Sequence, residues 1–255
     1  MIGEKRAAML KLNVGKLTFI QKFFQVKNIL QGCLVVCMLF GSTVGVAKTT
    51  NSESTKESYQ ALSLIKNTPK DLKSINPRVL KLALKAHQKA HSLGLAQKSL
   101  MTIIDYSLPS TQRRLWVVDM TKGKVMYHTL VAHGSGSGGN MANRFSDVHG
   151  SLQSSLGVFV TGKTYQGKHG LSLTLHGLEK GINGNAASRR IVVHGAHYVN
   201  ENTAGKLGRL GRSWGCPALD TRLARPIIQT IKDGSLVFAY YPDDKWLNRS
   251  KFVSG

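Results

Sequence analysis

One cysteine and one histidine carry the chemistry that this sequence suggests. Cys216 follows a glycine in the segment 211–219 (GRSWGCPAL), and His194 ends the β-branched run of 191–196 (IVVHGA). A free thiol, with a pKa of about 8.5, is mostly protonated at neutral pH, so a cysteine nucleophile needs a base or a cation beside it. Glycine before Cys216 permits a tight turn, which lets backbone amides approach a substrate carbonyl. The two segments therefore predict a Cys–His site for acyl transfer.

Cysteine usage supports a chemical role for Cys216. The chain has 3 cysteines, and Cys33 and Cys37 fall inside an N-terminal export signal, so Cys216 is alone in the mature chain. An oxidising compartment penalises an idle exposed thiol. A lone cysteine there is either buried and inert or kept for chemistry. The glycine-rich, polar neighbourhood of Cys216 favours chemistry.

The N-terminal 47 residues have the pattern of an export signal. Basic residues dominate the start, an apolar run spans 29–47, and Gly45 and Ala47 have the small side chains expected before a cleavage site. This order is typical of a secretory signal. The apolar run is also near the ~18 residues that span a membrane, so an uncleaved anchor is the alternative. Either way, we expect the protein in the periplasm or cell envelope.

The net charge of +22 narrows the classes of partner. It fits a solvated basic surface or affinity for acidic envelope polymers. Nucleic acid is excluded as a partner because the sequence has neither a recognition motif nor interleaved aromatic residues. Membrane contact is expected only through the N-terminal segment, if it stays uncleaved.

A linker and a helical preface are predicted over 48–98. Residues 48–58 are rich in Ser, Thr, Lys and Glu, which is typical of a flexible linker. Pro77 suits the first turn of a helix and Gly94 its end. His87 and His91 share one face of that helix, but without a third ligand we interpret them as part of a solvated face.

Short strands dominate residues 99–243. Apolar or alternating runs predict strands over 101–106, 114–120, 124–132, 157–161, 171–176, 190–194 and 236–241, with one helix over 221–232. A Gly/Ser/Asn-rich stretch, 133–155, is long for a loop in a compact domain, so we expect it to be functional or mobile, for example as a lid. The fold class is mainly β (α+β), and residues 244–255 are expected to be a C-terminal tail.

The motifs resemble a known family. HGA followed by SWGC resembles the HG…(S/T)xGC signature of YkuD-like L,D-transpeptidases, and 155–159 (SLGVF) is similar to an upstream strand motif of that family. The stretches 161–170, 175–183, 188–199 and 208–219 resemble a divergent murein L,D-transpeptidase branch. The resemblance covers roughly residues 100–243. It implies a β-sandwich with few helices and a Cys thioester formed with peptidoglycan stem peptides, with no metal and no organic cofactor.

The resemblance also implies roles for individual residues. Cys216 would be the nucleophile, His194 its base and later its general acid, and Ser213 a supporting hydrogen-bond partner. Amides around Gly215 and Cys216 would form the oxyanion hole, and the Gly195 carbonyl or a nearby polar group would orient the imidazole. Candidate substrate-binding residues are Arg212, Trp214, Gly195, Tyr165, His169 and His176.

Departures from the family pattern leave the reaction open. Trp214 stands where the family has histidine, and Ala218 where it often has Arg or Asn. These positions would meet substrate, so the cleaved bond and the acceptor are uncertain. We therefore expect a peptidoglycan L,D-transpeptidase, with an L,D-carboxypeptidase or endopeptidase using the same site, or a non-catalytic peptidoglycan-binding protein, as alternatives.

Overall fold

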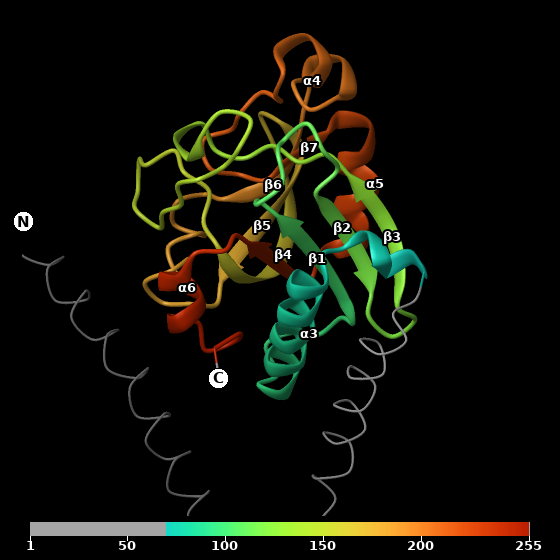
Figure 1. The fold of residues 1–255 in the computed structure, drawn as a ribbon, viewed down its shortest axis with the longest axis vertical. Coiled ribbons are helices and arrows are strands. Elements are labelled where there is room, and N and C mark those ends of the chain that lie inside the picture. Colours follow the sequence, from blue (N-terminus) through green and yellow to red (C-terminus); the bar gives the residue numbers. More distant parts are fainter. Residues whose placement is uncertain (1–69, 255) are drawn as a thin grey trace, which may run out of the picture. The chain divides into compact units, whose positions relative to one another are not determined.

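The computed structural model describes residues 70–254 (Figure 1). Its eight strands form one continuous sheet in the order β3-β2-β1-β8-β4-β5-β6-β7. The strands are β1 (Leu100–Asp105), β2 (Leu115–Asp119), β3 (Lys124–Thr129), β4 (Gly157–Gly167), β5 (Gly170–Gly177), β6 (Val192–Ala196), β7 (Ala218–Asp220) and β8 (Leu236–Tyr240). The predicted signal and the linker 48–58 lie outside the described residues.

Within residues 70–254, four α-helices and two short 3₁₀ turns accompany the sheet. They are η1 (Lys70–Ser74), α3 (Pro77–Ser92), η2 (Ser135–Ser137), α4 (Glu201–Leu207), α5 (Thr221–Ile231) and α6 (Asp244–Arg249). The expected class, mainly β with few helices after a helical segment, is confirmed. None of the helices in residues 70–254 has the length and apolar character needed to cross a bilayer.

Helix α3 begins where the sequence predicted. The Asn76 side chain accepts a hydrogen bond from the Arg78 amide, and Pro77 occupies the first turn. One face of the helix is buried, including Leu80 and Leu84, in the same apolar core as the sheet. The helical preface is thus packed into the core of the sheet.

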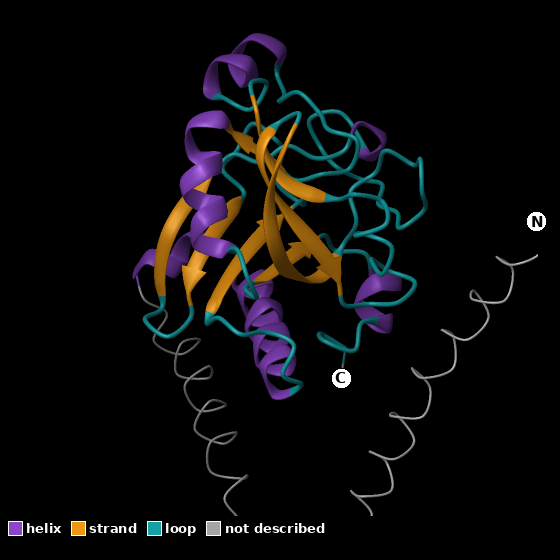
Figure 2. Ribbon diagram, turned by 180° about the vertical axis from the view of Figure 1, so that it is seen from behind, coloured by secondary structure: helices purple, strands orange, loops and turns teal. Residues whose placement is uncertain are grey.

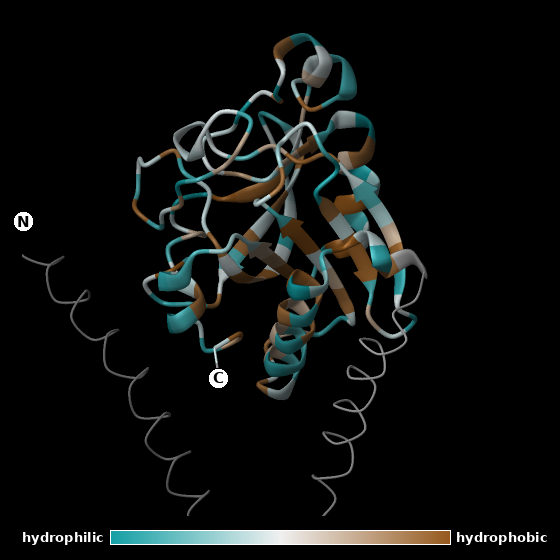
Figure 3. Cartoon of the chain, in the orientation of Figure 1, coloured by the Kyte–Doolittle hydropathy of each residue, from teal (hydrophilic) through white to brown (hydrophobic). Residues whose placement is uncertain are grey.

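The sheet joins the two halves of the domain through its last strand. β8 pairs in parallel with β1 on one side and antiparallel with β4 on the other. Apolar residues are dense along these central strands (Figure 3), and α5 covers part of the sheet from behind (Figure 2). This core fixes the ends of β6 and β7, where the candidate site lies.

Three expected strands have different boundaries in the structure. The strand predicted over 190–194 runs from Val192 to Ala196, so His194 lies in its middle and not at its end. The strand predicted over 124–132 ends at Thr129, and Ala132 makes only an isolated bridge to Ala218. The strand predicted over 157–161 continues to Gly167, because β4 and β5 form a long hairpin. The C-terminal tail after residue 243 forms α6 and buries Trp246 and Phe252 in the core.

Candidate active site

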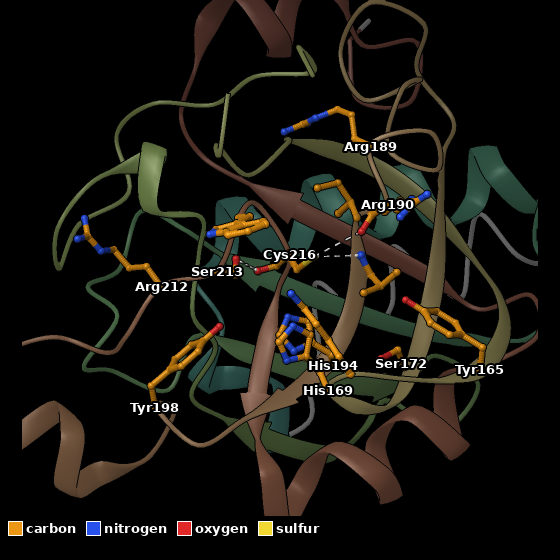
Figure 4. A pocket seen from close by; sticks show the side chains of 15 residues that line it. Tyr165, His169, Ser172, Arg189, Arg190, His194, Tyr198, Arg212, Ser213 and Cys216 are labelled. Atoms are coloured by element: carbon orange, nitrogen blue, oxygen red, sulfur yellow. Dashed lines mark hydrogen bonds between the residues drawn. The ribbon is translucent and has the colours of Figure 1, made fainter. Parts of the chain in front are cut away.

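A pocket of about 570 Å³ opens at the ends of β6 and β7 (Figure 4). It brings together seven of the residues singled out in the sequence, which are Tyr165, His169, His194, Arg212, Ser213, Trp214 and Cys216. β6 and β7 pair in parallel with His194 opposite Ala218, so the segment just before β7 lies beside β6. This pairing carries Cys216 into the pocket that His194 also lines.

Cys216 is half-buried against the backbone that leads into β6. Its Sγ lies 3.4 Å from the Val192 amide nitrogen, which donates to it, and 3.7 Å from the Arg190 carbonyl oxygen, which accepts from the thiol. Burial raises the pKa of the Cys216 thiol, while the Val192 N–H and the charge of Arg189 oppose that rise. The thiol is therefore mainly protonated until a base takes its proton.

His194 is held in an orientation suited to that base. It is 2% exposed, and its ring Nδ1 lies 2.9 Å from the Gly195 carbonyl oxygen. A carbonyl only accepts, so Nδ1 carries the hydrogen and Nε2 has a free lone pair. Burial lowers the pKa of His194, and the nearby His169 and Lys168 lower it further. The imidazole is thus neutral at pH 7.

The turn before Cys216 requires glycine. Gly215 has φ +122°, and a Cβ there would lie 2.7 Å from the Gln153 carbonyl oxygen. The Gly215 amide donates to Ser213 Oγ at 3.1 Å, and the Ser213 hydroxyl donates to the Cys216 carbonyl oxygen at 2.6 Å. Ser213 therefore holds the turn through two hydrogen bonds, and its expected role as a supporting residue rests on them.

These bonds correct the expected oxyanion hole. The Gly215 N–H is engaged by Ser213 and so is not free for a substrate oxygen. The Cys216 N–H has no hydrogen-bond partner among residues 70–254. Only one of the two expected amides is therefore available, and a second donor must come from elsewhere.

The long loop 133–155 supports the cysteine turn from behind. The Ser213 amide donates to the His133 carbonyl at 3.0 Å, and the Ser135 amide donates to the Ser213 carbonyl at 2.8 Å. The Ser154 hydroxyl donates to the Gly215 carbonyl at 3.0 Å. The polar groups of this loop bond to the buried side of the turn, so the loop acts as a brace for Cys216. Its expected mobility as a lid stays a prediction.

Arg189 completes this support and was missed in the sequence. Its side chain is 3% exposed and lines the pocket. The guanidinium donates to four oxygens of the loop: Ser146 O, Ser155 Oγ, Ser151 Oγ and Gln153 O. Its charge also lowers the pKa of Cys216. An arginine in the run 188–190 (SRR) is typical of a solvated surface, so its burial could not be predicted from the sequence.

Tyr198 is a second lining residue that sequence reasoning missed. The Tyr198 side chain is half-buried and points its hydroxyl into the pocket (Figure 4). Burial and the nearby Cys216 raise the pKa of Tyr198 to about 12. The phenol stays protonated at neutral pH, and its hydroxyl has no hydrogen-bond partner within residues 70–254. The sequence offered one indication that Tyr198 lines the pocket, which is its position four residues after His194.

The opposite side of the pocket is exposed. Trp214 is 73% exposed, and the Lys168 ammonium lies 5.1 Å from the centre of its ring. Tyr165 is 45% exposed, and the His169 ring stacks on His194 with 4.5 Å between ring centres. These three residues, Tyr165, Lys168 and His169, lie at or beside the tip of the β4–β5 hairpin. The hairpin tip therefore forms this side of the pocket.

Three expected substrate-binding residues lie elsewhere or act differently. His176 is exposed on β5, opposite Val160, and does not line the pocket. Gly195 faces α5, where a Cβ would lie 3.1 Å from the Ala224 side chain, so it contributes only its carbonyl. Arg212 lines the pocket but points away from its centre and donates to the Gly138 carbonyl at 2.8 Å (Figure 4).

Residues 70–254 contain no group of three His, Cys, Asp or Glu side chains arranged to hold a metal ion. The His87 and His91 rings lie 4.2 Å apart between centres on α3, and both are partly buried. The solvated face expected for this pair is therefore wrong, because the core around α3 covers much of both rings.

The chain is similar to proteins of known class. The family model for the L,D-transpeptidase catalytic domain matches residues 71–240. No curated protein sequence matches the chain.

Solved structures also match the chain, at low identity. An L,D-transpeptidase from Mycobacterium smegmatis is 12% identical, with a TM-score of 0.36, over 56% of this chain and 59% of that one. The helical cell shape determining protein Pgp2 from Campylobacter jejuni is 14% identical, with a TM-score of 0.36, over 62% of this chain and 57% of that one. An L,D-transpeptidase from Stackebrandtia nassauensis is 14% identical, with a TM-score of 0.33, over 76% of this chain and 93% of that one. The chain thus spans less than two thirds of the first two structures.

Proposed function

The chain belongs to the L,D-transpeptidase catalytic domain family, and from this membership we propose that it transfers acyl groups between peptidoglycan stem peptides through Cys216. The observation that carries the proposal is the shared pocket of Cys216 and His194, with the His194 Nδ1 fixed on the Gly195 carbonyl. That bond leaves Nε2 free to take the thiol proton.

In the first half of the reaction, the donor peptide acylates the enzyme. His194 Nε2 accepts the Cys216 proton, and the thiolate sulfur attacks the carbonyl carbon of the scissile peptide bond. The Cys216 N–H and the Tyr198 hydroxyl donate to the oxygen that becomes negative. The intermediate collapses, His194 returns the proton to the leaving amine, and a thioester remains on Cys216.

In the second half, an amino group of another stem peptide attacks the thioester. His194 takes a proton from that amine, the C–S bond breaks, and the proton passes to the sulfur. A new peptide bond forms and the thiol is restored. Both the raised pKa of Cys216 and the lowered pKa of His194 support a neutral thiol–imidazole pair as the resting state.

A hydrolase is the second candidate for the same site. The exposed hairpin tip and Trp214 leave the pocket open to solvent on one side, so water has access to a thioester. Water in place of the acceptor amine would make the protein an L,D-carboxypeptidase or endopeptidase. A binding protein without catalysis is less well supported, since it has no use for an oriented imidazole beside a thiol.

The family and the basic chain also support a location. We place the protein in the periplasm or cell envelope, exported by its N-terminal segment, with stem peptides as partners and acidic envelope polymers as weaker ones.

The test incubates purified protein with stem tetrapeptide muropeptides, beside the Cys216→Ala variant, and analyses products by mass spectrometry. Cross-linked dimers formed only by the wild type support transpeptidation. Shortened monomers formed only by the wild type identify a hydrolase. Identical products from wild type and Cys216→Ala would refute a role for Cys216 in either reaction.

A further inference from the structure

The pocket around Cys216 has a one-sided charge. Its lining includes four residues with permanent positive charge, Lys168, Arg189, Arg190 and Arg212, and no Asp or Glu. A cavity lined by one sign of charge attracts ligands of the other sign. The four cations differ, however, in whether their side chains already donate hydrogen bonds to other parts of the protein.

Two of the four cations are engaged by the protein itself. Arg189 donates to the carbonyls of Ser146 and Gln153 in the loop behind the cysteine turn. Arg212 donates to the Gly138 carbonyl and points away from the pocket centre (Figure 4). These side chains hold backbone in position, so they are not free to bind a substrate anion.

Arg190 is the cation with no such engagement. Its carbonyl oxygen accepts from the Cys216 thiol at 3.7 Å, so the residue lies directly beside the nucleophile. Its side chain is exposed and extends to the same side of Cys216 as Tyr165 (Figure 4). Within residues 70–254 its guanidinium has no hydrogen bond and no ion pair.

The backbone of Arg190 is held in an unusual conformation. Its φ is +57°, in the left-handed region that side chains with a Cβ rarely adopt. The Arg190 amide donates to the Ala187 carbonyl, and the Ile191 amide donates to the Ala186 carbonyl, which fixes this turn. This pair of bonds is the usual closing pattern of a left-handed turn at a helix end, and it holds the Arg190 carbonyl beside the Cys216 thiol.

Lys168 faces the pocket from the hairpin. Its ammonium lies 5.1 Å from the centre of the exposed Trp214 ring, and it is close enough to His194 to lower the pKa of that group. A cation over an aromatic face keeps its hydrogens available for a second partner. Lys168 therefore adds positive charge to the pocket without an internal carboxylate.

We propose that Arg190, assisted by Lys168, binds a free carboxylate that flanks the scissile bond, so that the site selects acidic donor peptides. The inference rests on the proposed acyl transfer and adds the chemical class of its donor. A guanidinium pairs with a carboxylate through two parallel hydrogen bonds, and a neutral amide cannot replace that pairing. Amidation of the donor carboxylates therefore makes a poor substrate.

The experiment compares two stem tetrapeptides, one with free carboxylates and one with the same carboxylates converted to amides. We expect wild-type kcat/KM to favour the acidic donor by about fivefold to tenfold, as for a partly exposed charge pair. Arg190→Gln lowers kcat/KM for the acidic donor to that of the amidated donor. The rate for the amidated donor stays within about twofold.

Matched variants separate recognition from other effects. Arg190→Lys keeps the charge and retains part of the preference. Arg225→Gln removes the same charge from the exposed side of α5, outside the pocket, and retains the whole preference. Alkylation of Cys216 by the neutral reagent iodoacetamide proceeds at the same rate in wild type and Arg190→Gln, because the thiol is unchanged.

The outcomes are distinct. Equal losses on both donors, or a preference that survives Arg190→Gln, overturn the role of Arg190. Wild-type turnover of both donors at equal rates overturns donor selection but leaves the proposed function standing. Turnover of neither donor refutes the proposed function itself. If Arg190→Gln fails to fold in a thermal melt, Lys168→Gln on the exposed hairpin decides by a smaller loss of the same preference.

Discussion

The two sides of the Cys216 pocket are built differently. The braced wall consists of the backbone of the turn 213–216, the Ser213 side chain, the loop 133–155 and Arg189, and its polar groups bond to one another away from solvent. The open wall consists of the hairpin tip 165–170 and Trp214, whose side chains are largely exposed. Bond making tolerates little positional error, while substrates vary in shape. The fixed side therefore suits chemistry and the exposed side suits recognition.

The largest expected effect on kcat comes from replacing His194, the proposed general base. We expect His194→Gln to lower kcat by about 10²- to 10⁴-fold, because general base catalysis by the imidazole is lost. His169→Gln, on the open wall, is the matched control and should change kcat far less. Steady-state rates with a stem peptide measure both, and equal losses would contradict the assignment of base catalysis to His194 and of recognition to the open wall.

Gly215→Ala should break the braced wall itself. The substitution forces a side chain into φ +122° and places a Cβ 2.7 Å from the Gln153 carbonyl oxygen. We expect a loss of about 3 kcal/mol in the free energy of unfolding, together with loss of activity. Gly139→Ala is the control, since a Cβ there meets nothing within 4 Å. Denaturant unfolding compares them, and equal stabilities would show that the turn can relax.

Acid should weaken the braced wall through His133. Burial and the nearby Arg114 lower the pKa of His133 to about 4. In the unfolded chain His133 binds a proton near pH 6.5, whereas in the folded chain it binds one only near pH 4. The free energy of unfolding therefore falls as pH drops from about 6.5 to about 4.

We expect His133 to contribute about 3 kcal/mol to that fall. His133→Gln removes the titrating group, so its unfolding free energy should depend less steeply on pH over the same window. Chemical denaturation at several pH values gives the two slopes. Identical slopes would mean that His133 titrates alike in the folded and unfolded chains.

Arg189→Met tests whether the brace also tunes the nucleophile. The loop carbonyls lose their donor, and we expect a loss of about 1–3 kcal/mol in stability. The Cys216 pKa should rise because a nearby positive charge has gone. The pH dependence of iodoacetamide alkylation measures this rise. Arg225→Met, outside the pocket, should leave the alkylation profile unmoved.

Trp214→Ala should show the smallest effect on stability. The side chain is 73% exposed, so we expect less than about 0.5 kcal/mol of change in unfolding free energy. KM for a stem peptide should rise by about threefold if the ring contacts substrate. Leu207→Ala, 59% exposed on α4, is the control that should leave KM alone. An unchanged KM in Trp214→Ala would assign recognition to other parts of the open wall.

The reacting residues could be predicted from the sequence, but most of the residues that hold them in place could not. The β-branched run before His194 and the glycine before Cys216 are local signals, so a strand at His194 and a turn at Cys216 could be inferred. The predicted end of that strand at His194 is wrong, because β6 continues to Ala196. The extension of β4 to Gly167 could not, because its outer residues are polar and exposed and carry no apolar alternation. The brace was also hidden, since Ser154 and Arg189 acquire partners only when distant segments meet.

The position of β8 has a consequence for how the protein is made. The final strand of the sheet, Leu236–Tyr240, lies between β1 and β4 and is the only strand that pairs with both halves. During synthesis, the strands up to β7 emerge from the ribosome before the strand that joins them. The two halves of the sheet therefore cannot be joined until almost the whole chain has left the ribosome, and a chain that stops before Leu236 lacks the strand that connects them.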